Sequence, residues 1–390
     1  MYNIKTLNNI DQSGLDRFSS ESFTINADNH DIDAIILRSY GLHDFEIPAS
    51  VKAIGRAGAG VNNIPVDEMS SRGIPVFNAP GANANAVKEL TLAALLISAR
   101  NICSARDYVK SINPDDVNLK SSIESGKKQF AGIELPGRTL GVIGLGSIGV
   151  HVANAALALG MKVIGFDPKV TVTNAWKLSS GVEKVDDLDE IFKRSDAVTI
   201  HVPLVEQTEN LINAKCLNLL RKNSILINFS RGGVVNTSDV LSALDDNFLS
   251  SFVCDFPEPP LMKHKKVIAL PHLGASTMEA EQNCAVMVAD NLIDYIENGN
   301  INYSVNFPTA VMNRADGYRL TVANKNIPNM VGQISTYLAT AGLNIEDLLN
   351  KSYGDLAYTI VDLDTEIPEK IIDQISRIEG VLLVRSLGCS

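Results

Sequence analysis

The stretch that decides the fold is Gly144-Leu145-Gly146-Ser147-Ile148-Gly149. An apolar run, Thr139 to Ile143, comes directly before it and is typical of a buried strand, and a helical run, Val150 to Leu159, follows it. A second apolar run, Met161 to Phe166, ends on Asp167. Strand, glycine turn, helix, strand and acid in this order predict a dinucleotide-binding unit.

Each glycine of this turn has a separate physical role. Gly144 permits the tight turn, Gly146 lets the backbone approach a pyrophosphate, and Gly149 lets the helix pack closely on the strand. The pyrophosphate then sits at the helix N-terminus, where unpaired N–H groups and the helix dipole favour negative charge. Asp167 can accept hydrogen bonds from an adenosine ribose and would repel a 2′-phosphate, so the sequence predicts NAD rather than NADP.

Length, charge and cysteine content exclude several classes of protein. A chain of 390 residues is too long for one hydrophobic core, and about two to three domains are expected. A net charge of −11 argues against a nucleic-acid or membrane-surface partner, and it means that an anionic substrate needs a local cluster of positive charge. No apolar run reaches membrane-spanning length, and no signal-peptide pattern is present.

The cysteines are odd in number and scattered, without a CxxC pair. We therefore expect neither a metal site nor a disulfide framework, and a cytoplasmic location. The cysteines are Cys103, Cys216, Cys254, Cys284 and Cys389.

Two arginines near the start of the chain follow predicted strands. Arg38 comes directly after Ala34 to Leu37, and Arg56 comes after Val51 to Gly55 and precedes the turn Gly58-Ala59-Gly60. An arginine beside small residues offers a fork of charged donors and exposed backbone N–H groups, which suits a carboxylate or a phosphate. The alternatives are a solvated loop arginine at Arg38 and an ordinary strand-to-helix turn after Arg56.

Three further polar residues lie at strand ends after the glycine turn: Arg231, Glu258 and His272. Oxidation of an alcohol by NAD needs a base for the hydroxyl proton, and the pKa of histidine suits that task. A carboxylate can orient the histidine, and an arginine can hold a substrate carboxylate in bidentate fashion. Taken singly they could be a helix-start salt bridge, a turn residue and a strand-end cap. His201 also ends a strand, and we rank it as non-catalytic.

The order of predicted elements indicates an α/β fold. Strands alternate with helices from 139 to 270, which predicts a parallel, doubly wound sheet. Residues 1–94 follow a similar pattern, and the long helix Met278 to Glu297 could carry the chain back to them. Residues 118–132 read as a connecting segment, 306–316 as a linker, and 317–387 as a small βαββαβ domain.

These motifs resemble the D-isomer-specific 2-hydroxyacid dehydrogenases, over nearly the whole chain. The residues that carry the resemblance are Gly144–Gly149 with Asp167, Asn228–Gly233, Pro271–Thr277, Arg56–Ile64 and Glu89–Thr91. The resemblance implies an NAD-binding Rossmann domain at 95–280, a discontinuous flavodoxin-like substrate domain at 1–94 and 281–308, and an ACT-like regulatory domain at 317–390.

The resemblance also implies roles for single residues. It makes Arg231 the substrate binder, Glu258 the partner of the histidine and His272 the acid/base. The implied substrate contacts are Arg38, Arg56, Gly58, Ala59 and Gly60. The implied cofactor contacts are Thr91, Gly144, Gly146, Ser147, Ile148, Gly149, Asp167, Val202, Phe229, Ser230, Arg231, Asp255, His272, Gly274 and Ala275.

The C-terminal segment resembles an ACT domain, which in this family often binds serine at a dimer interface. Asn326 and Asn344 match ligand asparagines of that domain, and Asn324 stands where a histidine often contacts serine. The resemblance thus implies a serine effector and a homodimer or homotetramer. The alternative is a purely structural dimerisation domain.

The activity that the resemblance implies is NAD-dependent oxidation of 3-phospho-D-glycerate to 3-phosphohydroxypyruvate, the entry to serine synthesis. Two alternatives stay open. The first is another dehydrogenase of the same kind, acting on glycerate, glyoxylate or 2-oxoglutarate. The second is a non-catalytic NAD-sensing protein similar to transcriptional co-repressors.

Overall fold

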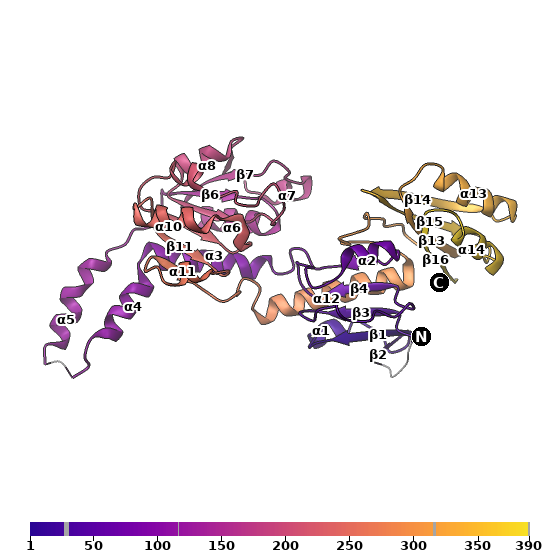
Figure 1. Ribbon diagram of the computed structural model, residues 1–390, viewed down its shortest axis with the longest axis horizontal. Coiled ribbons are helices and arrows are strands. Elements are labelled where there is room, and N and C mark those ends of the chain that lie inside the picture. The colour runs from indigo at the N-terminus through magenta and orange to yellow at the C-terminus, as the bar shows by residue number, and fades with distance from the viewer. Residues whose placement is uncertain (27–30, 116, 315–316, 389–390) are drawn as a thin grey trace. The chain divides into compact units, whose positions relative to one another are not determined.

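A computed structural model describes residues 1–26, 31–115, 117–314 and 317–388. The chain forms two compact units (Figure 1): Ala84–Thr277, and Met1–Asn83 together with Met278–Ser390. We call them the cofactor unit and the substrate unit. The domain boundaries expected from the sequence, at 94 and 95 and at 280 and 281, stay predictions.

The cofactor unit is built on a parallel sheet with the strand order β12-β11-β10-β9-β6-β7-β8 in its described part. Its strands are β6 (Thr139–Ile143), β7 (Lys162–Phe166), β8 (Val182–Lys184), β9 (Ala197–Ile200), β10 (Ser224–Asn228), β11 (Leu249–Cys254) and β12 (Val267–Ala269). The order reverses between β6 and β9, which is the switch point at which doubly wound sheets bind dinucleotides. The predicted fold class is confirmed.

Helices cover both faces of this sheet. The α-helices of this unit, which include α4 and α5 away from the sheet, are α3 (Ala84–Ala99), α4 (Ile102–Ser111), α5 (Leu119–Gly126), α6 (Ser147–Ala158), α7 (Val172–Lys177), α8 (Leu188–Arg194), α9 (Ala214–Leu217), α10 (Thr237–Asp245) and α11 (Pro259–Met262). The apolar side chains of α3 and α6 share one hydrophobic cluster with β6. Gly160 ends the turn after α6 with φ +78°, a left-handed conformation that glycine adopts without strain.

The helices α4 and α5 form an arm that projects from the rest of the cofactor unit (Figure 1). The expectation that 118–132 is only a connecting segment is wrong, because α5 occupies Leu119–Gly126. Contacts between its own residues stabilise the arm. The Tyr108 ring packs against Phe130 with centroids 5.3 Å apart, and the Tyr108 hydroxyl donates to the Ser122 carbonyl at 2.8 Å. A Cβ on Gly126 would lie 2.3 Å from the Tyr108 ring, so this glycine is needed for the close approach of the two helices.

The substrate unit contains a second parallel sheet, with the order β2-β1-β3-β4-β5 in its described part. Its elements are β1 (Tyr2–Leu7), α1 (Gln12–Leu15), β2 (Phe23–Ile25), β3 (Ala34–Leu37), β4 (Ala53–Arg56), α2 (Val66–Ser71), β5 (Val76–Phe77) and α12 (Met278–Asn298). This is the flavodoxin-like order, as expected. The helix α12 lies against β4 so closely that a Cβ on Gly55 would be 2.4 Å from Val288 Cγ1.

The last part of the substrate unit is an antiparallel sheet with the order β14-β15-β13-β16 in its described part. Its elements are β13 (Tyr318–Lys325), α13 (Met330–Thr340), β14 (Ile345–Tyr353), β15 (Leu356–Leu363), α14 (Glu369–Ser376) and β16 (Val381–Leu387). We call it the small domain, and its βαββαβ order is the expected one. Its helices cover one face of the sheet, and Tyr358 and Ile360 on the other face join the core around α12.

The described ranges contain neither a membrane-spanning helix nor a cluster of metal ligands. Within them, none of the helices combines the length and the apolar character that a membrane crossing demands. Nor do three or more His, Cys, Asp or Glu side chains gather there as the ligands of a metal ion would. Of the positions singled out from the sequence, Cys389 and residues 315–316 of the expected linker lie outside the described residues.

Candidate active site

The glycine turn has the geometry that each of its glycines predicts. Gly144 has φ +89°, and a Cβ there would lie 2.6 Å from the His201 carbonyl oxygen. A Cβ on Gly149 would lie 1.9 Å from the Gly144 oxygen. In contrast, a Cβ on Gly146 would meet nothing within 4 Å, because this residue faces open space at the N-terminus of α6. That space, next to backbone N–H groups, suits a pyrophosphate.

Asp167 is anchored beside this turn. Its Oδ2 accepts a hydrogen bond from the Leu145 N–H at 2.8 Å, and its Oδ1 accepts one from the Lys169 N–H at 2.8 Å. Val202, just after β9, also reaches the turn, since its Cγ1 lies 2.9 Å from the position of a Cβ on Gly144. The residues expected at the adenosine end therefore lie together at the carboxyl edge of the sheet.

The loop after β10 is organised by Asn228, which the sequence reasoning did not single out. Its Oδ1 accepts hydrogen bonds from the N–H and the hydroxyl of Ser230, at 3.0 and 2.7 Å, and its Nδ2 donates to the Arg231 carbonyl at 2.9 Å. The side chain of Asn228 thereby shapes the turn that presents Arg231. The guanidinium of Arg231 lies 5.8 Å from the centre of the Phe256 ring.

Asp255 is a buried carboxylate at this edge. It is 2% exposed, and its Oδ2 accepts a hydrogen bond from the Gly274 N–H at 3.1 Å. Its Oδ1 is buried with no hydrogen-bond partner among the described residues. Burial raises the pKa of this carboxyl, and the Gly274 N–H and the charge of His272 oppose the rise. An unpaired buried acceptor here fits a cofactor that brings an N–H group, as the carboxamide of nicotinamide does.

His272 and Glu258 are both exposed, and the described interactions include no hydrogen bond or ion pair between them. The His272 ring packs on Phe256, with centroids 4.3 Å apart. Glu258 begins α11 and precedes Pro259. The charge of His272 instead acts on Asp255, where it opposes the rise in the pKa of that carboxyl. The pairing of Glu258 with His272 stays a prediction, and Asp255 joins it as a second acid near the ring.

Two other residues named for this site differ in exposure, since Thr91 is buried and His201 is half-buried. Thr91 is 0% exposed, and its hydroxyl donates to the Val87 carbonyl of the same helix at 2.8 Å, so its contact with the cofactor stays a prediction. His201 lies 3.0 Å from the Thr199 hydroxyl, measured from its Nε2, and burial lowers the pKa of the ring to about 3. A ring that stays neutral at pH 7 does not suit acid/base work.

The predicted substrate arginines lie in the substrate unit, at the carboxyl ends of β3 and β4. Arg56 Nε donates to Asn63 Oδ1 at 2.9 Å. Asn63 Nδ2 donates in turn to the carbonyls of Tyr40 at 2.7 Å and Arg38 at 3.2 Å. The Asn63 amide therefore ties the two arginine loops together. The sequence around Asn63 carries no sign of this role, because its carbonyl partners lie on another loop.

The small residues after Arg56 allow its side chain to fold over the turn. A Cβ on Gly58 would lie 2.4 Å from Arg56 Nη1. The Ala59 carbonyl accepts a hydrogen bond from Asn78 Nδ2 at 2.6 Å, and Gly60 continues the same turn. The structure thus brings the expected substrate residues together within the substrate unit.

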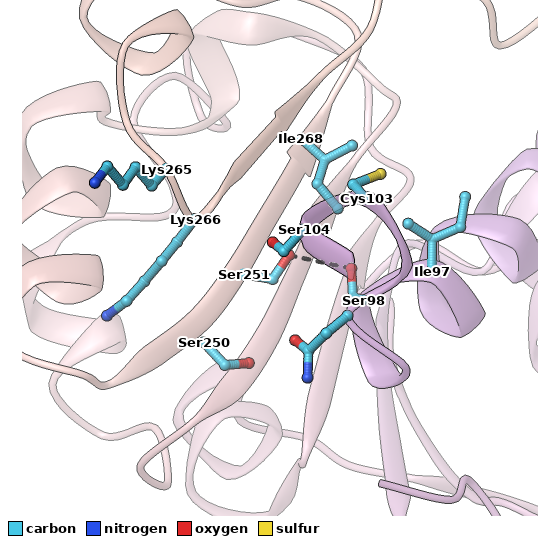
Figure 2. A pocket seen from close by; sticks show the side chains of 10 residues that line it. Ile97, Ser98, Cys103, Ser104, Ser250, Ser251, Lys265, Lys266 and Ile268 are labelled. Atoms are coloured by element: carbon cyan, nitrogen blue, oxygen red, sulfur yellow. Dashed lines mark hydrogen bonds between the residues drawn. The ribbon is translucent and has the colours of Figure 1, made fainter. Parts of the chain in front are cut away.

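A cavity of about 250 Å³ lies in the cofactor unit, and its lining includes none of Arg231, Glu258, His272 and the glycine turn (Figure 2). Ser251 and Ser98 line it and share a hydrogen bond of 3.1 Å between their hydroxyls. Ser251 stands near the start of β11 and Lys266 directly before β12. The cavity therefore opens at the amino ends of the strands, opposite the edge at which α/β sheets bind nucleotides.

A second cavity, of about 160 Å³, lies in the small domain. It is lined by Asn324, Asn326, Asn350 and the first residues of α13. Asn324 is 1% exposed, and its Oδ1 has no partner among the described residues. Asn344 is not among the lining residues, because it follows the far end of the 11-residue helix α13, about 16 Å away at 1.5 Å per residue.

Comparisons with known proteins agree with this geometry. The profile described as "D-isomer specific 2-hydroxyacid dehydrogenase, NAD binding domain" matches residues 92–274. D-3-phosphoglycerate dehydrogenase from Escherichia coli K12 is 33% identical over 349 residues, which cover 86% of this chain and 81% of that protein. The chain belongs to the D-isomer-specific 2-hydroxyacid dehydrogenase family. It is an NAD-dependent dehydrogenase by family, and 92–274 is its NAD-binding region.

Other members of the family differ in length and in similarity. D-3-phosphoglycerate dehydrogenase from Methanocaldococcus jannaschii is 35% identical over 345 residues. The matched region covers 85% of this chain but only 62% of that relative. The solved structure of NAD⁺-bound 3-phosphoglycerate dehydrogenase from Entamoeba histolytica superposes with a TM-score of 0.61 and 21% identity, over 78% of this chain and 98% of that one. At this identity the likeness concerns the fold.

Proposed function

We propose that the protein oxidises 3-phospho-D-glycerate to 3-phosphohydroxypyruvate with NAD, the first step of L-serine biosynthesis. The observation that carries the proposal is the similarity, over 86% of the chain, to a relative named D-3-phosphoglycerate dehydrogenase. The arginine pair of the substrate unit supports it, because a phosphorylated hydroxyacid has two anionic ends and a chain of net charge −11 needs local cations to bind them.

The residues take the following roles in this proposal. Arg231 binds the substrate carboxylate in bidentate fashion, and Arg56 with Arg38 binds the phosphate. His272 accepts the proton of the C2 hydroxyl, and a nearby acid, Glu258 or Asp255, stabilises the imidazolium that results. Bound NAD supplies the hydride acceptor. In the cofactor unit, Asp167 holds the ribose and the Gly146 backbone leaves room for the pyrophosphate.

The test is NADH formation by the purified protein with a panel of acids. 3-Phospho-D-glycerate should give the highest kcat/KM, above D-glycerate, glycolate and D-2-hydroxyglutarate. A higher kcat/KM with an unphosphorylated acid would show that this acid is the substrate, and the protein would still be a 2-hydroxyacid dehydrogenase. No turnover with any acid, together with retained NADH binding, would favour the NAD-sensing alternative.

The small domain is proposed to bind serine in the cavity beside Asn324. The unpaired Asn324 Oδ1 suits an ammonium donor, and the N-terminus of α13 suits a carboxylate. Serine should inhibit NADH formation, and Asn324→Ala should raise the half-inhibitory concentration at least about tenfold with kcat unchanged when serine is absent. Glycine and D-serine are the ligand controls. Equal inhibition of both proteins would remove Asn324 from the site.

A homodimer or homotetramer is proposed as the assembly. The arm of α4 and α5 exposes apolar side chains, with Ile102 48%, Val109 49% and Ile123 39% exposed, which is unusual for a helix pair without a partner. Sedimentation of the full chain gives the mass directly, and a monomer at micromolar concentration would contradict the proposal.

We also propose a cytoplasmic location and no nucleic-acid partner, supported by the free thiols of the described cysteines and the acidic charge.

A further inference from the structure

Arg38, one arginine of the proposed phosphate site, is already held by a carboxylate of its own chain. Its Nη1 lies 2.7 Å from Glu281 Oε2. The side chain of Arg38 is 33% exposed and that of Glu281 is 42% exposed, so a solute can reach the pair. Arg38 directly follows β3, whereas Glu281 lies in the first turn of α12. The ion pair therefore joins two elements that are far apart in the sequence.

The position of Glu281 is set by the packing of its helix. Cys284, one turn later, is 5% exposed, and Val288 after it packs against Gly55 of β4. Because α12 is fixed on the sheet in this way, the Glu281 backbone cannot drift away from Arg38. The carboxylate is thus presented to the arginine by a rigid element.

The second arginine belongs to the same cluster of charges. Leu37 pairs in register with Arg56, so Arg38 leaves the sheet beside Arg56. Burial raises the pKa of the Cys284 thiol, Arg38 and Arg56 lower it, and Glu281 raises it, which shows that all three charges lie near this thiol. Of the two arginines, Arg38 is the one with an ion pair to Glu281, whereas Arg56 donates to Asn63.

We propose that Glu281 determines substrate specificity as a built-in counter-ion of Arg38, which a phosphate-ended substrate displaces and a carboxylate-ended one does not. The inference rests on the proposed function, since it concerns the arginine pair that binds the anionic end of the substrate. Glu281 touches Arg38 and acts through it, so it is a positioning residue and takes no part in hydride transfer.

The physical reason is the charge of the competing anion. A carboxylate-ended substrate that replaces Glu281 exchanges one monoanion for another, and Arg38 gains little. A phosphate monoester carries a charge of about −1.5 to −2 at pH 7 and has three strong acceptor oxygens, so Arg38 gains both attraction and hydrogen bonds. The released carboxylate remains at the N-terminus of α12, where the helix dipole favours it, and this lowers the cost of the exchange.

The experiment compares two substrates that differ at the distal anion: 3-phospho-D-glycerate and D-2-hydroxyglutarate. Glu281→Gln keeps the length and an acceptor oxygen for Arg38 but removes the charge. We expect the KM for D-2-hydroxyglutarate to fall about two- to fivefold, the range of an exposed ion pair, and the KM for 3-phospho-D-glycerate to fall less. The kcat should stay unchanged with both acids.

The matched control is Glu279→Gln, which removes the same charge from the same turn of α12 at an exposed position. It should leave the ratio of the two KM values unchanged. If the ratio is the same in wild type and Glu281→Gln, or if Glu279→Gln changes it equally, the proposal is overturned.

A double-mutant cycle tests the route through Arg38. Arg38→Ala should raise both KM values, and adding Glu281→Gln to it should no longer change their ratio. A shift that persists without Arg38 would mean general repulsion and would contradict the proposal.

Calorimetry with the NADH-loaded protein measures the Kd of each acid. The ratio of the two Kd values corresponds to the ratio of the two KM values and needs no turnover. If no variant oxidises either acid, the proposed function is contradicted but the role of Glu281 is not. The ratio of the two binding affinities then tests the role of Glu281 independently of turnover.

Discussion

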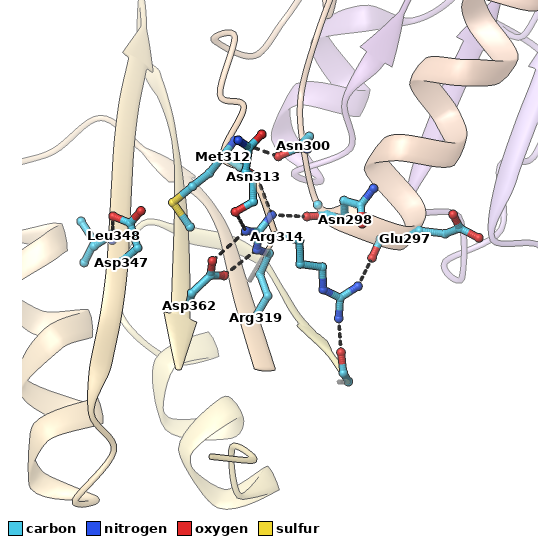
Figure 3. Close-up of polar contacts among 12 residues, drawn as sticks. Glu297, Asn298, Asn300, Met312, Asn313, Arg314, Arg319, Asp347, Leu348 and Asp362 are labelled. Carbon is cyan, nitrogen blue, oxygen red and sulfur yellow. Dashed lines mark hydrogen bonds and ion pairs between the residues drawn. The ribbon is translucent and has the colours of Figure 1, made fainter. Parts of the chain in front are cut away.

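Arg319 and Asp362 form a buried bidentate ion pair across two neighbouring strands of the small domain. Arg319 Nε lies 2.6 Å from Asp362 Oδ1, and Nη2 lies 2.8 Å from Oδ2, in a pair whose side chains are 0% and 6% exposed. The other Arg319 N–H groups donate to the carbonyls of Asn298, Met312 and Asn313 at 2.8 to 3.0 Å (Figure 3). One guanidinium thus links the small domain to the end of α12.

Arg319→Met should destabilise the substrate unit by about 3–5 kcal/mol, because the Asp362 carboxylate stays buried without its partner. Urea unfolding followed by circular dichroism measures the free energy. The double variant Arg319→Met with Asp362→Leu should lose less than the single variant, since it removes the orphaned charge. A single variant within about 1 kcal/mol of wild type would show that the pair is not required.

Arg385 caps the same end of α12. Its Nη1 and Nη2 donate to the carbonyls of Tyr295 and Ile296 at 2.9 and 2.8 Å, and its guanidinium lies 4.3 Å from the centre of the Tyr295 ring. Lysine has no planar fork, so Arg385→Lys should cost about 1–3 kcal/mol and speed hydrogen exchange in the last turn of α12. The exposed Arg377→Lys is the control, and equal exchange rates in the two variants would contradict the capping role.

Gly146→Ala should separate folding from cofactor binding. The position has φ −72° and open space around its Cβ, so the unfolding free energy should change by no more than about 0.5–1 kcal/mol. The new methyl group would occupy the space of the pyrophosphate, and the Kd for NADH should rise at least about tenfold. Gly149→Ala should instead impair folding itself. A Kd for NADH equal to that of wild type would show that the pyrophosphate does not bind next to Gly146.

His272→Asn should lower kcat by about 10²- to 10⁴-fold, because no other base replaces the imidazole, while the Kd for NADH should change little. His264→Asn is the control in the same unit, since His264 pairs with Asp245 through its Nε2 at 3.3 Å. Stopped-flow measurement of the first turnover isolates the chemical step. A kcat near that of wild type would exclude His272 as the acid/base.

Asp255→Asn should raise stability and weaken cofactor binding together. Burial raises the folded-state pKa of Asp255 above its ordinary value of 3.8, so its favourable contribution is present below that pH and is lost as the pH rises through the folded pKa. The stability of the variant relative to wild type should therefore grow as the pH rises above 3.8. The Kd for NADH should rise about three- to tenfold, because an acceptor for the carboxamide is replaced by an amide that also donates.

The exposed Asp246→Asn controls for the loss of one charge in the cofactor unit. Thermal denaturation across this pH range measures the difference. Parallel pH profiles for wild type and Asp255→Asn would show that the carboxyl of Asp255 does not titrate in this range.

Local pattern was sufficient for the elements near the glycine turn. The predicted strand Thr139–Ile143 coincides with β6, and Ala34–Leu37 coincides with β3. Their apolar runs are buried on both faces, which makes them readable without knowledge of their neighbours. The helix α5 was missed because its glycine and serine residues resemble a loop, and only its contact with Tyr108 shows why a helix forms there.

The sequence by itself determined that the chain binds a dinucleotide and that Arg231, Glu258 and His272 follow strands of one sheet, because glycine spacing and strand ends are properties of short segments. Only the tertiary structure decided which groups those residues meet. Asn63 ties Arg56 to the Arg38 loop, Glu281 neutralises Arg38, and Asp255 is the acid whose pKa the charge of His272 lowers. Such partners depend on how a helix packs on a sheet, and that packing brings together residues whose separation in the sequence carries no sign of their contact.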